Sequence, residues 1–147
     1  MATGSRDGLT VTQQARLATA LERCRRDNGL DASILVGDLA VADPAEFRAA
    51  AEQVHAALGA RSHSAVLIIV APGQRKVEII TGPAVRRRVP DRVAALAVMS
   101  MVSAFNGGDL TGGLLDGLRQ LADAAGKAAP LPPLPEGSAQ LALSAGH

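Results

Sequence analysis

Apolar residues recur along this chain with two periods, one typical of amphipathic helices and one typical of strands. A first helix is predicted to start at Thr10, because Thr10 and Gln13 form a Thr-x-x-Gln capping box, and to stop near Gly29. A second starts at residues 43–46 (Asp-Pro-Ala-Glu), which supply an N-cap, a proline at the first helical position and a capping-box glutamate. Its apolar stripe predicts a helix that covers a sheet and ends at a cap near Gly59.

Three segments have the pattern of strands. Residues 31–37 alternate around two apolar positions, and residues 65–71 are apolar throughout, as expected of a strand that is covered on both faces. The dipeptide Pro72-Gly73 predicts a type II turn. Residues 76–81 should therefore return as the second strand of a hairpin.

Two further helices and a tail are predicted after the hairpin. The helix from about residue 90 to Phe105 has apolar groups around most of its circumference, so we expect it to be buried on most sides at the centre of one layer. Residues 107–109 (Gly-Gly-Asp) should end it and cap a last helix that stops near Gly126. The proline-rich residues 128–147 lack a core period and predict a disordered tail.

The composition bounds the class of protein. A chain of 147 residues fits one domain, which we expect at residues 9–127, after a flexible N-terminus at residues 1–8 and before the tail. The chain has no Trp and no Tyr, so base stacking has almost no platform, and a net charge of +1 gives no overall attraction for a polyanion. Nucleic acid is therefore an unexpected partner.

Cys24 is the only cysteine, which excludes an intramolecular disulfide and predicts a role as core filler. The N-terminus lacks the apolar run of a signal peptide, and no segment approaches the roughly 18 consecutive apolar residues of a transmembrane helix. From these features we expect a soluble α/β domain of cytoplasmic type.

Three segments resemble the TPM domain: residues 65–72 (AVLIIVAP), 75–82 (RKVEIITG) and 105–114 (FNGGDLTGGL). Residues 86–91 (RRRVPD), ahead of residues 100–105 (SMVSAF), are similar to the actinobacterial group named domain of unknown function 5130. The resemblance spans roughly residues 8–125. It implies a three-layer α/β/α sandwich around a small mixed sheet with a β-hairpin and about four helices, in agreement with the apolar pattern.

The functions that this resemblance implies are diverse. TPM domains are mostly anchored outside the membrane and are associated with photosystem repair, receptor regulation, calcium binding and a modest acid phosphatase activity, so the fold alone does not fix a function. Where TPM domains commonly carry Asp-Asn-Gly this chain has Ser62-His63-Ser64, and where they carry a Glu it has Arg86–Arg88. Ca²⁺ prefers six to eight oxygen ligands. We therefore expect no cofactor, although the resemblance implies Ca²⁺, and the replacement of two ligands weakens the inference both of Ca²⁺ binding and of a metal-dependent phosphatase activity.

Cationic residues are the main candidates for ligand binding. The hairpin and the helix entrance after it could gather them at one end of the sheet; they are Arg75, Lys76, Arg86, Arg87, Arg88 and Arg92. Guanidinium groups suit phosphates and carboxylates, so a phosphorylated ligand, an RNA backbone or an acidic partner protein would fit. The alternative is a solvated face on which arginines pair with Asp91 and Asp109.

Asp91 and Asp109 also match the TPM pattern, which makes them candidates for a general base or a metal ligand. Helix capping explains an aspartate at either position equally well. Three further aspartates, Asp31, Asp38 and Asp43, are assigned to turns and caps.

Other chemistry-bearing residues give no motif. The histidines His55, His63 and His147 lack zinc-site spacing and are expected on the surface. The glycine pairs 107–108 and 112–113 lack the Gly-Lys-Ser/Thr of a nucleotide loop. The tail contains two Pro-x-x-Pro patterns, Pro130 to Pro133 and Pro132 to Pro135, which are typical of polyproline ligands and of linkers alike.

The leading hypothesis is a non-enzymatic binding or regulatory module that presents its basic surface to a protein partner or a small anionic ligand. One alternative is a TPM-type phosphatase or hydrolase that uses Asp91 and Asp109. Another is an oligomeric scaffold that assembles through an apolar patch on the third or fourth helix, with the oligomeric state left open.

Overall fold

The computed structural model describes residues 9–37, 43–131, 134 and 140–143. The predicted flexible N-terminus, residues 1–8, lies outside the described residues. In chain order the elements are α1 (Val11–Asn28), β1 (Asp31–Val36), α2 (Pro44–Ala56), the 3₁₀ helix η1 (Gly59–Ser64), β2 (Ala65–Ala71), the 3₁₀ helix η2 (Pro72–Gln74), β3 (Lys76–Thr81), α3 (Pro83–Arg86), α4 (Asp91–Asn106), α5 (Leu110–Ala125) and β4 (Leu141–Leu143).

The strands form one mixed sheet in the order β3-β2-β1-β4. β1 runs parallel to β2, from the pair Asp31 and Ala65 to the pair Val36 and Val70. β3 is antiparallel to β2, and β4 is parallel to β1. Every residue of β2 is buried, as its unbroken apolar run predicts.

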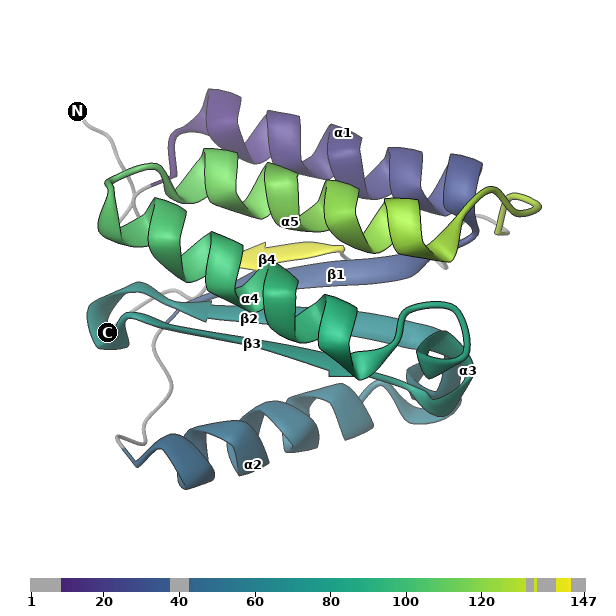
Figure 1. Ribbon diagram of the computed structural model, residues 1–147, viewed down its shortest axis with the longest axis horizontal. Coiled ribbons are helices and arrows are strands. Elements are labelled where there is room, and N and C mark those ends of the chain that lie inside the picture. Colours follow the sequence, from purple (N-terminus) through teal and green to yellow (C-terminus); the bar gives the residue numbers. More distant parts are fainter. Residues whose placement is uncertain (1–8, 38–42, 132–133, 135–139, 144–147) are drawn as a thin grey trace.

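Helices cover both faces of this sheet (Figure 1). α1, α5 and α4 lie side by side on one face and enclose the main core, to which Ile34, Ile68 and Ile79 contribute. α2 covers the other face, where Phe47 packs against the alternate strand residues of a smaller cluster. The predicted α/β/α sandwich is therefore confirmed. Over the described residues, none of the helices combines the length and the apolar character that a bilayer crossing requires.

The helix ends follow the predicted capping signals. Thr10 and Gln13 form both hydrogen bonds of a capping box at the start of α1, and Gly29 ends this helix in the left-handed conformation that glycine adopts without strain. The Asp43 carboxylate accepts from the amide of Ala45 at the start of α2. α2 stops earlier than predicted, with its C-cap at Ala57.

The central helix of the three-helix layer is α5, and the prediction that the preceding helix holds this place is wrong. α4 lies at the edge of the layer, and its outer face exposes Leu96 and Met99 to 56% and 67%. α5 can take the centre because it carries glycine where α4 approaches. A Cβ at Gly113 would lie 2.7 Å from the Ala104 Cβ.

The turn between β2 and β3 also differs from its prediction. Instead of a type II turn, the chain forms the 3₁₀ helix η2, and the residue with positive φ is Arg75 rather than Gly73. Four residues therefore connect the strand ends Ala71 and Lys76, which pair with each other. The hairpin itself is confirmed.

Residues 128–147 were expected to form a disordered tail, yet Leu141–Leu143 form β4 against β1. The tail also contacts the end of α1 earlier, where the amides of Ala128 and Leu131 donate to the carbonyls of Asp27 and Arg25. A three-residue strand is too short to give a sequence period, and its pairing partner lies about a hundred residues away. The sequence pattern therefore carried no signal for β4.

Candidate functional site

The segment from α3 to the first turn of α4 carries most of the exposed cationic groups that the sequence singled out. Val85 and Val89 are buried, and the amide of Val89 donates to the Val85 carbonyl, so this turn is anchored in the main core. The anchoring leaves Arg86 and Arg87 exposed, together with Arg92 in the first turn of α4. Within the described residues, none of these three arginines forms an ion pair. We call them the α3–α4 arginines.

Arg88 does not belong to this set. Its guanidinium is half-buried and donates to three main-chain carbonyls, those of Gly29 (3.2 Å), Asn28 (2.5 Å) and Ala125 (3.0 Å). These carbonyls belong to the C-terminal ends of α1 and α5, where four carbonyls of every helix lack an intrahelical partner. Arg88 therefore caps two helices, and its guanidinium is engaged by the main chain rather than presented with the α3–α4 arginines.

Arg75 and Lys76 are also separated from the α3–α4 arginines. Arg75 directly precedes β3 and Lys76 is its first residue, and a six-residue strand spans about 20 Å. Arg75 donates to the Asn106 side chain (3.4 Å) at the C-terminal end of α4, whereas Arg92 lies at the N-terminal end of that helix. The ammonium of Lys76 lies 5.8 Å from the Phe47 ring centroid. The six cationic residues thus occupy two ends of the sheet, not one.

An open pocket of about 420 Å³ lies beside the α3–α4 arginines, along the outer edge of β3. α2 contributes Arg48, β3 contributes Glu78, Ile79 and Thr81, and the remaining lining residues come from α3 and α4: Arg86, Asp91, Ala94, Ala95 and Val98. The pocket therefore has a partly apolar floor and charges of both signs around it.

Arg48 lines this pocket at the outer edge of β3, and the sequence pattern did not identify it as a site residue. It donates to the carboxylates of Glu52 (3.0 Å) and Glu78 (2.9 Å) and to the Ile79 carbonyl (3.5 Å). Burial acts to lower the pKa of Arg48, but the hydrogen bonds to Glu78 and Glu52 outweigh burial and raise it. Arg48 is thus committed to its own carboxylates, and Arg86 is the pocket cation without such a partner in the described chain.

Asp91 and Asp109 do not converge. They lie at the two ends of α4, whose 16 residues span about 24 Å. Asp109 is the N-cap of α5 and accepts from the Gly112 amide (3.0 Å), and Asp91 is exposed in the first turn of α4. No group of three or more potential metal-ligating side chains occurs in the described part of the chain. A shared catalytic or metal site of these two aspartates is therefore incompatible with the fold.

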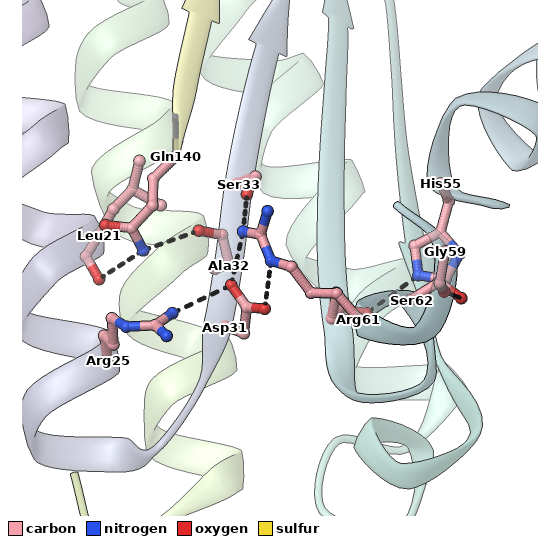
Figure 2. A network of polar contacts seen from close by, with 11 residues as sticks. Leu21, Arg25, Asp31, Ala32, Ser33, His55, Gly59, Arg61, Ser62 and Gln140 are labelled. Carbon is pink, nitrogen blue, oxygen red and sulfur yellow. Dashed lines mark hydrogen bonds and ion pairs between the residues drawn. The ribbon is translucent and has the colours of Figure 1, made fainter. Parts of the chain in front are cut away.

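A buried ionic network forms around Asp31, at the start of β1 (Figure 2). Its carboxylate receives Arg61 through Nε (2.7 Å) and Nη2 (2.8 Å), and Arg25 through Nη1 (3.2 Å). The hydrogen bonds to Asp31 raise the pKa of Arg61. Arg61 Nη2 also donates to the hydroxyl of Ser33 (3.2 Å). The network joins α1, β1 and η1, and its role is structural, because both oxygens of the Asp31 carboxylate accept from protein donors.

Sequence reasoning assigned Asp31 to a turn or cap, and this assignment is wrong, whereas Asp43 caps α2 as predicted. Neither Arg25 nor Arg61 was singled out. The one available signal was the place of Arg25, four residues after Leu21 and thus on the edge of the apolar stripe of α1. Asp38 lies outside the described residues.

The histidines divide between core and surface. His55 is 8% exposed, and its Nε2 lies 3.1 Å from the Ala65 carbonyl, to which it donates. Its predicted surface position is therefore wrong. His63 is exposed, as predicted, and His147 lies outside the described residues.

The remaining motifs have structural roles. Cys24 is buried, and burial raises the pKa of its thiol, so the core-filler prediction is confirmed. Gly107 and Gly108 connect α4 to α5 and do not form a nucleotide loop after a strand. Pro132, Pro133 and Pro135 of the two polyproline patterns lie outside the described residues.

The fold defines a small α/β/α domain with exposed arginines around α3 and the start of α4, and the described part of the chain holds no group of three or more potential metal-ligating side chains. The chain belongs to the family described as a domain of unknown function, DUF5130, which matches residues 5–122. The uncharacterized protein Rv2468c of Mycobacterium tuberculosis is 40% identical over 58 residues, which make up 40% of this chain. The match spans 35% of the length of that relative.

Solved structures share the fold at low sequence identity. The protein BA42 of Bizionia argentinensis has a TM-score of 0.74 and 18% identity, with 92% of this chain and 95% of that chain covered. The N-terminal domain of the protein cg2496 of Corynebacterium glutamicum has a TM-score of 0.66 and 13% identity, with 90% and 84% covered. A third similar structure is the N-terminal domain of a protein from P. gingivalis, with a TM-score of 0.68, 17% identity and coverage of 81% of this chain and 78% of that chain.

Proposed function

We propose that this chain is a non-enzymatic binding module that presents the α3–α4 arginines to an acidic partner protein. The observation that supports the proposal is the set of exposed guanidinium groups Arg86, Arg87 and Arg92, which have no ion-pair partner in the described chain. Guanidinium groups bind carboxylates and phosphates in the same bidentate geometry, so the site would also accept a small anionic ligand.

The mixed polar and apolar lining of the pocket favours a protein as the partner. Arg86 lines the β3-edge pocket together with the apolar residues Ala94 and Val98, so a partner could place an acidic group on the rim and an apolar one on the floor. The cytoplasmic location that the sequence leads us to expect is part of this proposal; it rests on the single thiol and the absence of any possible intramolecular disulfide. A TPM-type phosphatase would need Asp91 and Asp109 in one pocket, and α4 separates them.

The test is charge reversal at the α3–α4 arginines. The tagged chain with Arg86→Glu, Arg87→Glu and Arg92→Glu is compared with wild type in affinity purification from cell extract, followed by mass spectrometry. Arg88 stays unchanged, because its substitution would remove two helix caps. The matched control reverses the same number of charges on α1, with Arg16→Glu, Arg23→Glu and Arg26→Glu.

We expect partners that the wild type and the α1 control retain and that the α3–α4 variant loses. Thermal shift with inorganic phosphate and phosphorylated metabolites is the second arm, since a ligand of the native state raises its stability. If one of these compounds stabilises the wild type and the α1 control but not the α3–α4 variant, the ligand of the site would be a small anion and not a protein. An unchanged set of partners, with no such stabilisation, would refute the proposal.

A second candidate is a scaffold that assembles through α4. Its support is the outward pair Leu96 and Met99, which lie one turn apart on the edge helix of the layer. Light scattering coupled to size exclusion would detect the assembly, and Leu96→Glu with Met99→Glu should dissociate it. A wild type that stays monomeric at millimolar concentration would eliminate the homo-oligomer.

A further inference from the structure

β1 lies between β2 and β4, and only one of these two strands belongs to the part of the chain that the family model matches. Its neighbour β2 belongs to the family-matched region, residues 5–122, whereas β4 comes from the chain beyond that region. The side of β1 that faces β4 therefore belongs to the family-matched region, whereas β4, which pairs with it, lies outside that region. We call this side, made of the main chain of residues 32–36 with the neighbouring Leu21 carbonyl of α1, the β1 edge.

The occupant binds the β1 edge mainly through its backbone. The Ile34 amide donates to the Gln140 carbonyl (2.6 Å), and the register continues with Leu141 opposite Ile34 and Ala142 opposite Leu35. Leu141 is half-buried against the main core, and Ala142 is exposed. The edge thus requires an extended chain with an apolar residue at one position and accepts any small or polar residue at the next.

Gln140 supplies the specific contact. Its side-chain amide donates through Nε2 to the Ala32 carbonyl (3.2 Å) of β1 and to the Leu21 carbonyl (3.5 Å) of α1 (Figure 2). A glutamine amide has two N–H groups, so one side chain can satisfy both carbonyls. A glutamate carboxylate has no such donor and would be repelled by the same two oxygens. The edge therefore selects glutamine directly ahead of the apolar residue.

The occupant is held by few interactions. β4 pairs with β1 over three residues in parallel, fewer than the five or six of an average strand. It is joined to α5 through residues 126–139, which include four prolines. A short strand at the end of a long connection behaves as a tethered ligand, whose occupancy depends on its effective concentration and which a competing segment can displace.

We propose that the β1 edge is a binding site for an extended segment of a partner protein that carries glutamine directly ahead of an apolar residue, and that Gln140–Leu143 is its intramolecular occupant. Strand addition of this kind obtains affinity from main-chain hydrogen bonds and specificity from alternate side chains. The site lies at the opposite edge of the sheet from β3 and is independent of the α3–α4 arginines.

The test weakens the occupant within the full-length chain. Leu141→Asp places a charge against the core, and a fluorescent peptide with the sequence of residues 137–147 is titrated by anisotropy into the wild type and the variant. We expect the variant to bind the peptide at least about tenfold more tightly, because its own tail no longer competes. A peptide with Asp in place of Leu141 is the matched control and should bind neither protein.

Amide hydrogen exchange locates the binding. The Ile34 amide should exchange faster in the Leu141→Asp variant than in the wild type, and the peptide should restore its protection. Gln140→Ala provides a second variant if Leu141→Asp does not fold. Peptides that keep Gln-Leu with unrelated residues elsewhere should bind the variant within a few-fold of the native sequence.

Three results would overturn the proposal. The first is a folded variant whose Ile34 amide stays as protected as in the wild type, since β4 would then not be displaceable. The second is a folded variant that exposes this amide and yet binds neither the native peptide nor the patterned ones. The third is a variant that binds the native peptide alone, since the edge would then not accept segments of a partner.

Discussion

Arginine has three separable roles at the scale of single residues. Arg25 and Arg61 neutralise the buried carboxylate of Asp31, Arg88 caps helix carbonyls, and the α3–α4 arginines remain in solvent. The roles follow from what each guanidinium can reach: a carboxylate, main-chain oxygens or water. Only the last group is available to a partner, which is why neighbouring arginines of one sequence run must be tested separately.

Arg88→Ala should lower the free energy of unfolding by about 1–3 kcal/mol, because half-buried carbonyls of α1 and α5 lose their donor. The matched control is Arg87→Ala, one residue away and exposed, which should change it by less than about 0.5 kcal/mol. Urea denaturation followed by circular dichroism measures both. Equal effects of the two substitutions would mean that the cap contributes nothing to stability.

Asp31→Asn should destabilise the fold by about 3 kcal/mol, since removal of one partner of a buried pair leaves an uncompensated charge. The control is Asp116→Asn, which breaks the exposed pair with Arg119 and should leave unfolding unchanged within error. Denaturant unfolding of the two variants is the measurement. A stable Asp31→Asn variant would show that Arg25 and Arg61 find other partners or water.

At the scale of elements, the contact between α4 and α5 sets the shape of the helical layer. Gly113 faces α4, and a Cβ there would lie 2.7 Å from the Ala104 Cβ and 3.3 Å from the Met101 carbonyl. The second of these atoms belongs to the main chain and cannot rotate away. The glycine therefore allows the two helices to approach, at the cost of a lower helix propensity.

Gly113→Ala should reduce stability by about 1–3 kcal/mol, because the strain of overpacking exceeds the gain in helix propensity. Gly107→Ala is the control at the other side of the turn; its φ is −85° and its added Cβ would meet nothing closer than 3.5 Å. Thermal unfolding of the two variants gives the comparison. An alanine tolerated at residue 113 would mean that α4 can shift away without loss.

At the scale of the whole molecule, the parts that the sequence predicts are those that depend on neighbouring residues. The capping box at Thr10 and the apolar run of β2 are local signals, and both are confirmed. The ionic network unites residues up to 36 positions apart, Arg25 and Arg61, and β4 pairs with a strand a hundred residues away. The expectation that the cationic residues gather at one end of the sheet also depended on distant contacts. Only the direction of β3 shows that Arg75 and Arg86 lie at opposite ends of this strand.

The two faces of the sheet also differ in how much holds their helices. α1, α4 and α5 share one continuous core, whereas α2 contacts the sheet through a small cluster centred on Phe47 and Ala51. Cooperative units of a protein open with free energies that follow their buried apolar contacts. α2 should therefore open in a local step that leaves the rest of the domain folded.

Native-state hydrogen exchange tests this expectation in low denaturant. The amides of α2 should exchange through an opening free energy at least about 2 kcal/mol below that of the β2 amides, which should report global unfolding. Phe47→Leu should lower the opening free energy of α2 further by about 1 kcal/mol, with a smaller effect on the apparent opening of α5. If α2 and β2 exchange together, the small cluster is coupled to the main core through the sheet, and the domain is a single cooperative unit despite its unequal layers.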